Sequence, residues 1–211
     1  MKNKRTKGFT LIELLVVVGL IIVLSVVMLA NTNKFGGQSL LQNLAYDIAL
    51  SVREAQVYGI SVQRSSTGAT GFTAGYGMHF DMAHITTYNL FADAAATGLY
   101  VGGEDVQPSP YTIGQGFYIS KLCATPILTG TEICTGSSPT SVTKLDILFI
   151  RPEPDAYISI NGSPALTFDS NNNVIGGSQY LQARIVVSSP RGDAMSIVIS
   201  TNGQITVNNS N

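Results

Sequence analysis

The strongest constraint on this chain is a continuous apolar run close to its beginning. Residues 9–30 read FTLIELLVVVGLIIVLSVVMLA, and Glu13 is their one charged residue. An α-helix rises about 1.5 Å per residue, so a helix over this range extends roughly 33 Å. That length is enough to cross a hydrocarbon core of about 30 Å. The sequence therefore predicts a membrane-spanning helix over residues 9–30.

The residues before the run predict the orientation of this helix. Four basic residues and no acidic residue lie there: Lys2, Lys4, Arg5 and Lys7. The positive-inside rule keeps such an arm in the cytoplasm and exports the rest of the chain. A cleaved secretory signal ending at Ala30 is disfavoured, because its apolar region is normally about 7–15 residues and Met28 does not suit the small-residue cleavage pattern. We expect a single-pass protein with an extracytoplasmic domain.

Glu13 is the unusual residue of the span. An ionisable group inside a membrane segment is costly and indicates a function by default. It needs a cation, and no other side chain of the span supplies one. Cleavage after Gly8 would create that cation, since it leaves a new amine on Phe9.

Residues 7–15, KGFTLIELL, resemble the class III signal of type IV pilins and pseudopilins. The resemblance implies that residues 1–8 are a leader, that prepilin peptidase cuts after Gly8, and that Phe9 becomes the N-methylated terminus. It also implies that Glu13 pairs with the terminal amine of a neighbouring subunit during assembly. The expected partners are therefore prepilin peptidase, other pilin or pseudopilin subunits, and the inner membrane before assembly.

A second helical segment follows the span over residues 31–66. The polar stretch Asn31–Gly37 contains two adjacent glycines, which predict an interruption or bend near Gly36-Gly37. Six apolar residues then recur at spacings of three and four: Leu41, Leu44, Ala45, Ile48, Val52 and Ala55. This is one face of an amphipathic helix. We expect the helix to fade near Arg64 and to pack on a globular domain.

Residues 67–211 are expected to form a β-rich exported domain. A hairpin of Gly75–Phe80 and Ile85–Phe91 turns around Asp81–His84. Further strands are expected at 111–122, 144–150, 156–160, 181–188, 194–200 and 204–207. A helix followed by strands predicts an α+β fold, with the helix on an antiparallel sheet. The order of these pieces is similar to minor pseudopilins of the GspH/FimT type, which implies a helix packed on two small sheets.

Cys123 and Cys134 enclose ten residues. In an exported domain such a pair most often forms a disulfide that closes a surface loop. Two free thiols, or half of a metal site, are the alternatives. With His79 and His84 as the only histidines, a Cys/His zinc site is disfavoured. Both histidines are interpreted as hairpin surface or strand-edge positions.

We expect no metal or cofactor and no enzymatic activity. Asp93, Gly98 and Glu104 match part of an EF-hand frame, but Ala95 stands where a calcium ligand is required. Asp146, Glu153 and Asp155 are explained by a solvated turn. The chain contains no G-x-S-x-G, P-loop or H-E-x-x-H motif.

Charge argues against a nucleic-acid partner. The chain has 12 Lys and Arg and 13 Asp and Glu, and loss of residues 1–8 leaves a net charge of −5. Arg184, Arg191, Lys121 and Lys144 could still cluster, but a broad basic footprint is missing. The expected function is a structural subunit, a minor pilin or pseudopilin of a type IV pilus or type II secretion pseudopilus. The alternatives are a major pilin and a FimT-like subunit for DNA uptake.

Overall fold

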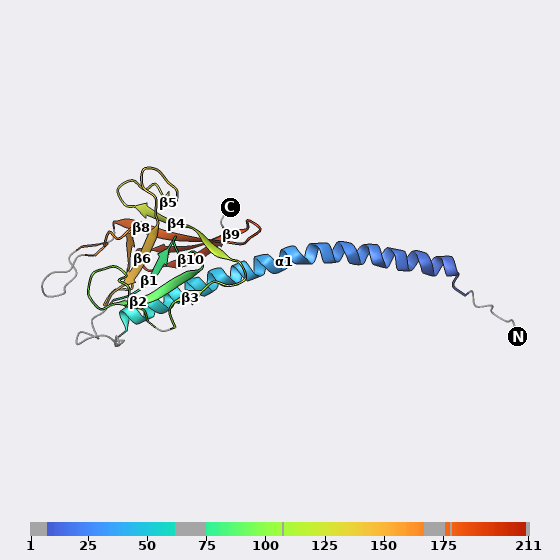
Figure 1. The fold of residues 1–211 in the computed structure, drawn as a ribbon, viewed down its shortest axis with the longest axis horizontal. Helices are drawn as coiled ribbons and strands as arrows, with labels where there is room; N and C mark the ends of the chain where they lie inside the picture. The colour runs from blue at the N-terminus through green and yellow to red at the C-terminus, as the bar shows by residue number, and fades with distance from the viewer. Residues whose placement is uncertain (1–7, 62–74, 107, 167–175, 178, 210–211) are drawn as a thin grey trace. The chain divides into compact units, whose positions relative to one another are not determined.

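The computed structural model of the chain describes residues 8–61, 75–106, 108–166, 176–177 and 179–209. These residues form one helix, α1 (Leu11–Ile60), followed by ten strands (Figure 1). The chain divides into two compact units, Met1–Leu40 and Leu41–Asn211, and all the strands belong to the second. The expected α+β class is confirmed.

Helix α1 differs from expectation in the middle and at its end. It includes residues 36–37, so the expected interruption at Gly36-Gly37 was wrong at the level of secondary structure. A glycine lowers helix stability by about 1 kcal/mol relative to alanine, but its backbone still donates and accepts the helical hydrogen bonds. The helix ends at Ile60, earlier than Arg64, which lies outside the described residues.

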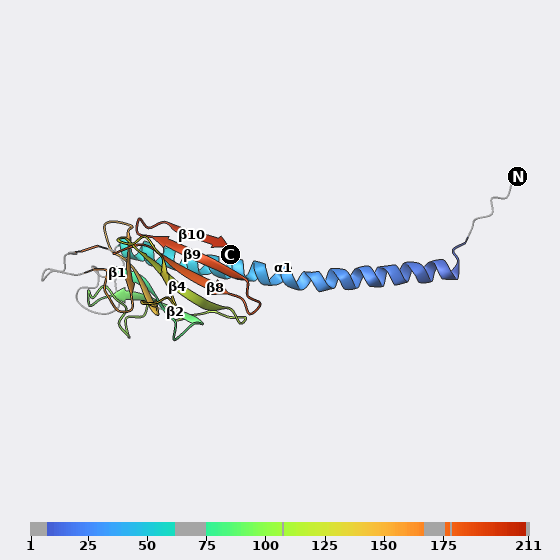
Figure 2. The same cartoon turned by 90° about the horizontal axis from the view of Figure 1, so that it is seen from above.

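The strands form two five-stranded antiparallel sheets. The first sheet has the order β3-β2-β1-β6-β7. Its strands are β1 (Gly75–Asp81), β2 (Thr87–Asp93), β3 (Tyr111–Thr112), β6 (Lys144–Phe149) and β7 (Ala156–Ile160). The second sheet has the order β10-β9-β8-β4-β5, and Figure 2 shows β8, β9 and β10 side by side. Its strands are β4 (Tyr118–Pro126), β5 (Ile133–Cys134), β8 (Tyr180–Ser188), β9 (Ala194–Ser200) and β10 (Ile205–Asn209).

The expected strand over residues 111–122 was wrong. The chain forms β3 in the first sheet, turns, and enters the second sheet as β4. Gln115 and Gly116 occupy the turn with φ of 59° and 77°, a left-handed conformation that ends a strand and that glycine adopts most readily. Strand β5 was not anticipated. The strands β7 and β9 have the bounds predicted from the sequence.

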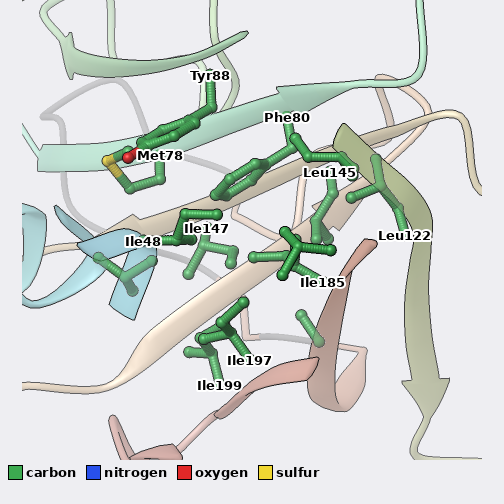
Figure 3. Close-up of a cluster of buried hydrophobic side chains, with 14 of the residues drawn as sticks. Ile48, Met78, Phe80, Tyr88, Leu122, Leu145, Ile147, Ile185, Ile197 and Ile199 are labelled. Atoms are coloured by element: carbon green, nitrogen blue, oxygen red, sulfur yellow. The ribbon is translucent and has the colours of Figure 1, made fainter. Parts of the chain in front are cut away.

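A shared core joins the second part of α1 to both sheets. The predicted helical face is confirmed, because Leu41, Ala45, Ile48, Val52 and Ala55 are buried and Leu44 packs beside them. Figure 3 shows Ile48 of α1 near Met78 and Ile147 of the first sheet, with Ile185, Ile197 and Ile199 of the second sheet in the same cluster. Burial of this apolar surface is the main force that holds the three elements together.

Polar side chains of α1 add specific contacts to this packing. The Gln56 amide is buried and donates Nε2 hydrogen bonds to the carbonyl oxygens of Pro154 at 2.8 Å and Gly203 at 3.1 Å. On the side of the first sheet, the Tyr111 hydroxyl donates to the Glu54 carboxylate at 3.1 Å. These bonds fix the position of the helix along its axis, which apolar packing alone leaves less defined.

Candidate functional site

The candidate processing and assembly site lies where α1 begins. Residues 8–10 precede the helix, whose first residue is Leu11. Thr10 is the N-cap: its Oγ1 accepts a hydrogen bond from the Glu13 backbone N–H at 3.3 Å, and its carbonyl oxygen accepts from Glu13 and Leu14. A threonine cap with a glutamate three residues later is a sequence pattern that starts helices. The helix start is therefore encoded locally.

Beyond the cap, the first part of α1 presents apolar side chains on all sides. Leu11 is 83% exposed, the other large apolar residues of α1 through Leu29 are exposed as well, and so is Phe9 just before the cap. The window Leu11–Leu29 is long and apolar enough to cross a membrane, and none of it is buried within the protein. Ser25 donates its hydroxyl to the Ile21 carbonyl oxygen at 2.7 Å, which satisfies it inside the helix. Such a surface needs lipid or other apolar helices around it.

Glu13 lies in the first turn of α1 and is exposed. Within the described part of the chain its carboxylate has no ion-pair partner. The helix N-terminus favours a negative charge through its dipole, yet this alone does not offset the cost of a carboxylate in hydrocarbon.

The comparison with protein families agrees with this geometry. Residues 3–29 match the family described as the prokaryotic N-terminal methylation motif. A search of curated proteins and one of solved structures both returned no match. The match supports a type IV pilin-like precursor that prepilin peptidase processes and that assembles with other pilins. Proteins with this motif are structural rather than catalytic, and the apolar helix fits their membrane anchor.

The cysteine pair lies at one edge of the second sheet. Cys123 of β4 is opposite Cys134 of β5, and the two are joined in a disulfide. Arg184 of β8 lies over this bridge, with Nη2 at 3.8 Å from the Cys123 sulfur. The Arg184 Nε and Nη2 atoms both donate hydrogen bonds to the Glu132 carboxylate, with Nε at 2.8 Å from Oε1. Glu132 was not singled out from the sequence, since it is 52 residues away from Arg184.

Two of the four cations considered for nucleic acid are paired with acids. Arg184 binds Glu132, and the Lys144 ammonium lies 3.6 Å from the Asp81 carboxylate. Lys144 belongs to the first sheet, whereas Arg184 belongs to the second. The positive charge of these two residues is therefore largely compensated locally.

The segment that partly matches an EF-hand uses its carboxylates inside the loop. Asp93 is buried and accepts hydrogen bonds from the backbone N–H groups of Thr97 and Gly98, both at 2.8 Å. Glu104 accepts from the backbone N–H groups of Ala95 and Val101. Burial raises the pKa of Asp93 above its ordinary value, although these hydrogen bonds act in the opposite direction. These two carboxylates brace the loop between β2 and β3.

The raised pKa of Asp93 gives a testable pH dependence. The folded protein holds the proton of the Asp93 carboxyl group more tightly than the unfolded chain does. Protonated Asp93 therefore favours folding below its unfolded pKa near 3.8. That contribution is lost as the pH rises through the higher folded pKa. We expect wild type to lose stability relative to Asp93→Asn over this interval. Thermal unfolding measured by circular dichroism across pH checks it, with exposed Asp155→Asn as the matched control. A pH-independent difference would contradict this assignment.

Two sequence interpretations in the first sheet were wrong. Asp146 is not in a solvated turn: it is 3% exposed in β6, a strand with neighbours on both sides. His79 is not a surface or edge residue, because it is buried in β1 with Nδ1 at 2.5 Å from Asp146 Oδ1. Tyr100, from the loop after β2, stacks on the His79 ring with 4.4 Å between centroids, which the strand pattern did not reveal. His84 does lie in the exposed hairpin turn.

Proposed function

We propose that the protein is a minor subunit of the GspH/FimT type, built into a type IV pilus or a type II secretion pseudopilus. The observation that carries the proposal is the methylation motif at residues 3–29, which overlaps an apolar helix whose side chains are exposed all round. The subtype is supported by the second unit, where a helix packs on two small antiparallel sheets. In this role the protein is a building block with no catalytic step of its own.

Processing is proposed to occur between Gly8 and Phe9. Both residues are exposed and precede the first helical turn. A peptidase needs an extended backbone at the bond that it cuts, and the Thr10 cap begins the helix just after it. Before processing, the basic leader would hold the N-terminus in the cytoplasm and the second unit on the other side of the membrane.

The amine that cleavage creates on Phe9 is the proposed partner of Glu13. An ammonium and a carboxylate in hydrocarbon are each costly alone, and become tolerable as a pair. A pair between the Phe9 amine of one subunit and Glu13 of its neighbour would define the axial step of a filament.

Mass spectrometry of the N-terminus tests the processing directly. We expect protein from its native membrane to begin at N-methylated Phe9, with residues 1–8 removed. Gly8→Leu should leave the leader attached, because the bulky side chain replaces the residue before the cut. The matched control is Gly19→Leu, at a glycine of the span with open space around it. An unprocessed Met1 or a start at Asn31 in wild type would overturn the proposal.

A further inference from the structure

The first sheet has a cavity of about 480 Å³ on the face that points away from the shared core. Ligand pockets of folded proteins typically measure ~300–1,000 Å³. The floor is polar and comes from three neighbouring strands, with six side chains: His79, Asp81, Thr87, Asn89, Lys144 and Asp146. Tyr100, from the loop between β2 and β3, forms part of the wall. This cavity belongs to the second unit and has no role in the proposed assembly of the first.

Antiparallel register brings these polar side chains together. In β1 and β6 they alternate with core residues such as Met78 and Ile147, because successive side chains point to opposite faces of a sheet. His79 is opposite Asp146, and Asp81 is opposite Lys144. On the other side of β1, His79 is opposite Asn89 of β2. Buried polar groups in central strands cost free energy unless they are hydrogen-bonded, and most of these groups are.

One nitrogen of the His79 ring, Nε2, is the exception, because it has no hydrogen-bond partner among the described residues. The residue exposure of His79 is 8%, and its Nδ1 is bound to Asp146. No described residue makes a hydrogen bond to its Nε2, and no buried side-chain nitrogen or oxygen of the described residues lacks a partner. Nε2 therefore faces the cavity that His79 lines. In the neutral imidazole Asp146 accepts the Nδ1 proton, which leaves Nε2 as a hydrogen-bond acceptor.

A second network holds the wall and the rim in place. The Tyr100 ring stacks on the His79 ring with 4.4 Å between centroids. Its hydroxyl donates to both oxygens of Asp105 at 3.1 Å, and Asn89 Nδ2 donates to Asp105 Oδ1 at 2.6 Å. Burial raises the pKa of Tyr100 to about 12, with help from the adjacent Asp105. The phenol therefore remains a neutral donor, and the cavity is pre-organised before any ligand arrives.

The charges around the cavity indicate the class of ligand. Asp81 is compensated by Lys144 at 3.6 Å, and Asp146 is bound to His79. An anion would find no free positive charge there, because the Lys144 ammonium is paired with Asp81, and a cation would have to compete with the His79 Nδ1–H for the Asp146 carboxylate. The cavity offers two hydrogen-bond acceptors, His79 Nε2 and the side-chain carbonyl oxygen of Asn89. The Thr87 hydroxyl can donate or accept, and the apolar ring of Tyr100 lies beside these groups. Hydroxyl groups that both donate and accept, on a small ring with apolar C–H edges, match this set.

We propose that this cavity binds a neutral saccharide unit, free or as part of a surface glycan. His79 Nε2 and the Asn89 side-chain carbonyl oxygen accept hydrogen bonds from its hydroxyl groups, Thr87 contributes a further hydrogen bond, and Tyr100 covers its apolar edge. The pilin-like subunit would then carry a glycan-binding site on its sheet domain. This site works whether or not the subunit is a minor one.

Binding can be measured on the full chain in micelles of lauryldimethylamine oxide, a detergent without a sugar headgroup. A glycan array and calorimetric titrations with maltose, cellobiose, lactose and N,N′-diacetylchitobiose are the probes. We expect at least one neutral glycan to bind. Asn89→Ala and Thr87→Val should each lower its affinity by about tenfold, as expected for one lost hydrogen bond in a desolvated site. Binding of the disaccharide itself indicates free sugar, and binding on the array alone indicates an extended glycan.

The control is Asn208→Ala, the same change at an exposed position of β10 in the other sheet. It should bind as wild type does. Thr87 is half-buried, so Thr87→Val should keep the wild-type unfolding midpoint. Asn89→Ala also loses the hydrogen bond to Asp105, so its midpoint is measured alongside its affinity. The proposal is overturned if no neutral glycan binds, or if Asn208→Ala weakens binding as much as Asn89→Ala. It is also overturned if both cavity variants bind with unchanged affinity.

Discussion

Glu13→Ala is expected to abolish entry of the subunit into filaments while cleavage after Gly8 continues. The substitution removes the carboxylate that we propose to pair with the Phe9 amine of a neighbour. An uncompensated charge left in a low-dielectric environment costs about 3–5 kcal/mol. Since ~1.4 kcal/mol is a factor of ten in an equilibrium constant, the subunit content of filaments should fall at least about 100-fold. The measurement is a quantitative immunoblot of sheared filaments against total membrane protein.

Two companion variants separate charge from side-chain size. Glu13→Gln keeps the length and removes the charge, so it should fail to assemble as Glu13→Ala does. Leu15→Ala, in the same exposed apolar segment, removes a side chain of similar size without touching a charge and should still assemble. N-terminal mass spectrometry confirms that each variant is cleaved. Normal incorporation of Glu13→Ala would show that Glu13 does not set the register.

Gly59→Ala is expected to destabilise the second unit although it should favour the helix. Gly59 is near the end of α1, where alanine is preferred over glycine by about 1 kcal/mol. A Cβ at this position would lie 2.4 Å from the carbonyl oxygen of Phe149 and 2.8 Å from its Cβ. Phe149 is fully buried in β6, so neither partner can move freely. Overpacking of this kind costs about 1–3 kcal/mol.

Thermal or urea unfolding followed by circular dichroism measures this effect. Gly114→Ala is the matched control, because its Cβ would have nothing within 4 Å and its backbone is not left-handed. We expect Gly114→Ala to be within about 0.5 kcal/mol of wild type, as for surface substitutions away from special features. A Gly59→Ala variant as stable as wild type, or more stable, would mean that helix and strand can separate at this contact.

Several elements follow from local sequence because their signals are local. The apolar span and the Thr10–Glu13 cap each lie within a few turns of one helix. The buried face from Leu41 to Ala55 follows from its spacing of three and four. Strands β7 and β9 were predicted with their observed bounds, since turn residues flank them.

Other features depend on residues that are distant in the chain. The sequence predicted one strand over residues 111–122, and only the tertiary structure assigned β3 and β4 to different sheets. The contact of His79 with Asp146 spans 67 residues, and that of Gln56 with Gly203 spans 147. The hydrophobic pattern of a strand reports which face is apolar, and it does not report whether a distant loop covers the other face.

The sequence by itself determined the membrane helix, the methylation signal with its glutamate, the α+β class and the core face of α1. These are set by composition and by periodicity over neighbouring residues. Only the tertiary structure decided the sheet to which each strand belongs, the close approach at Gly59 and the polar cavity around His79. Those features depend on strand register and loop packing. The free energy that stabilises them comes from contacts between segments that are distant in the chain, so no local sequence pattern reports them.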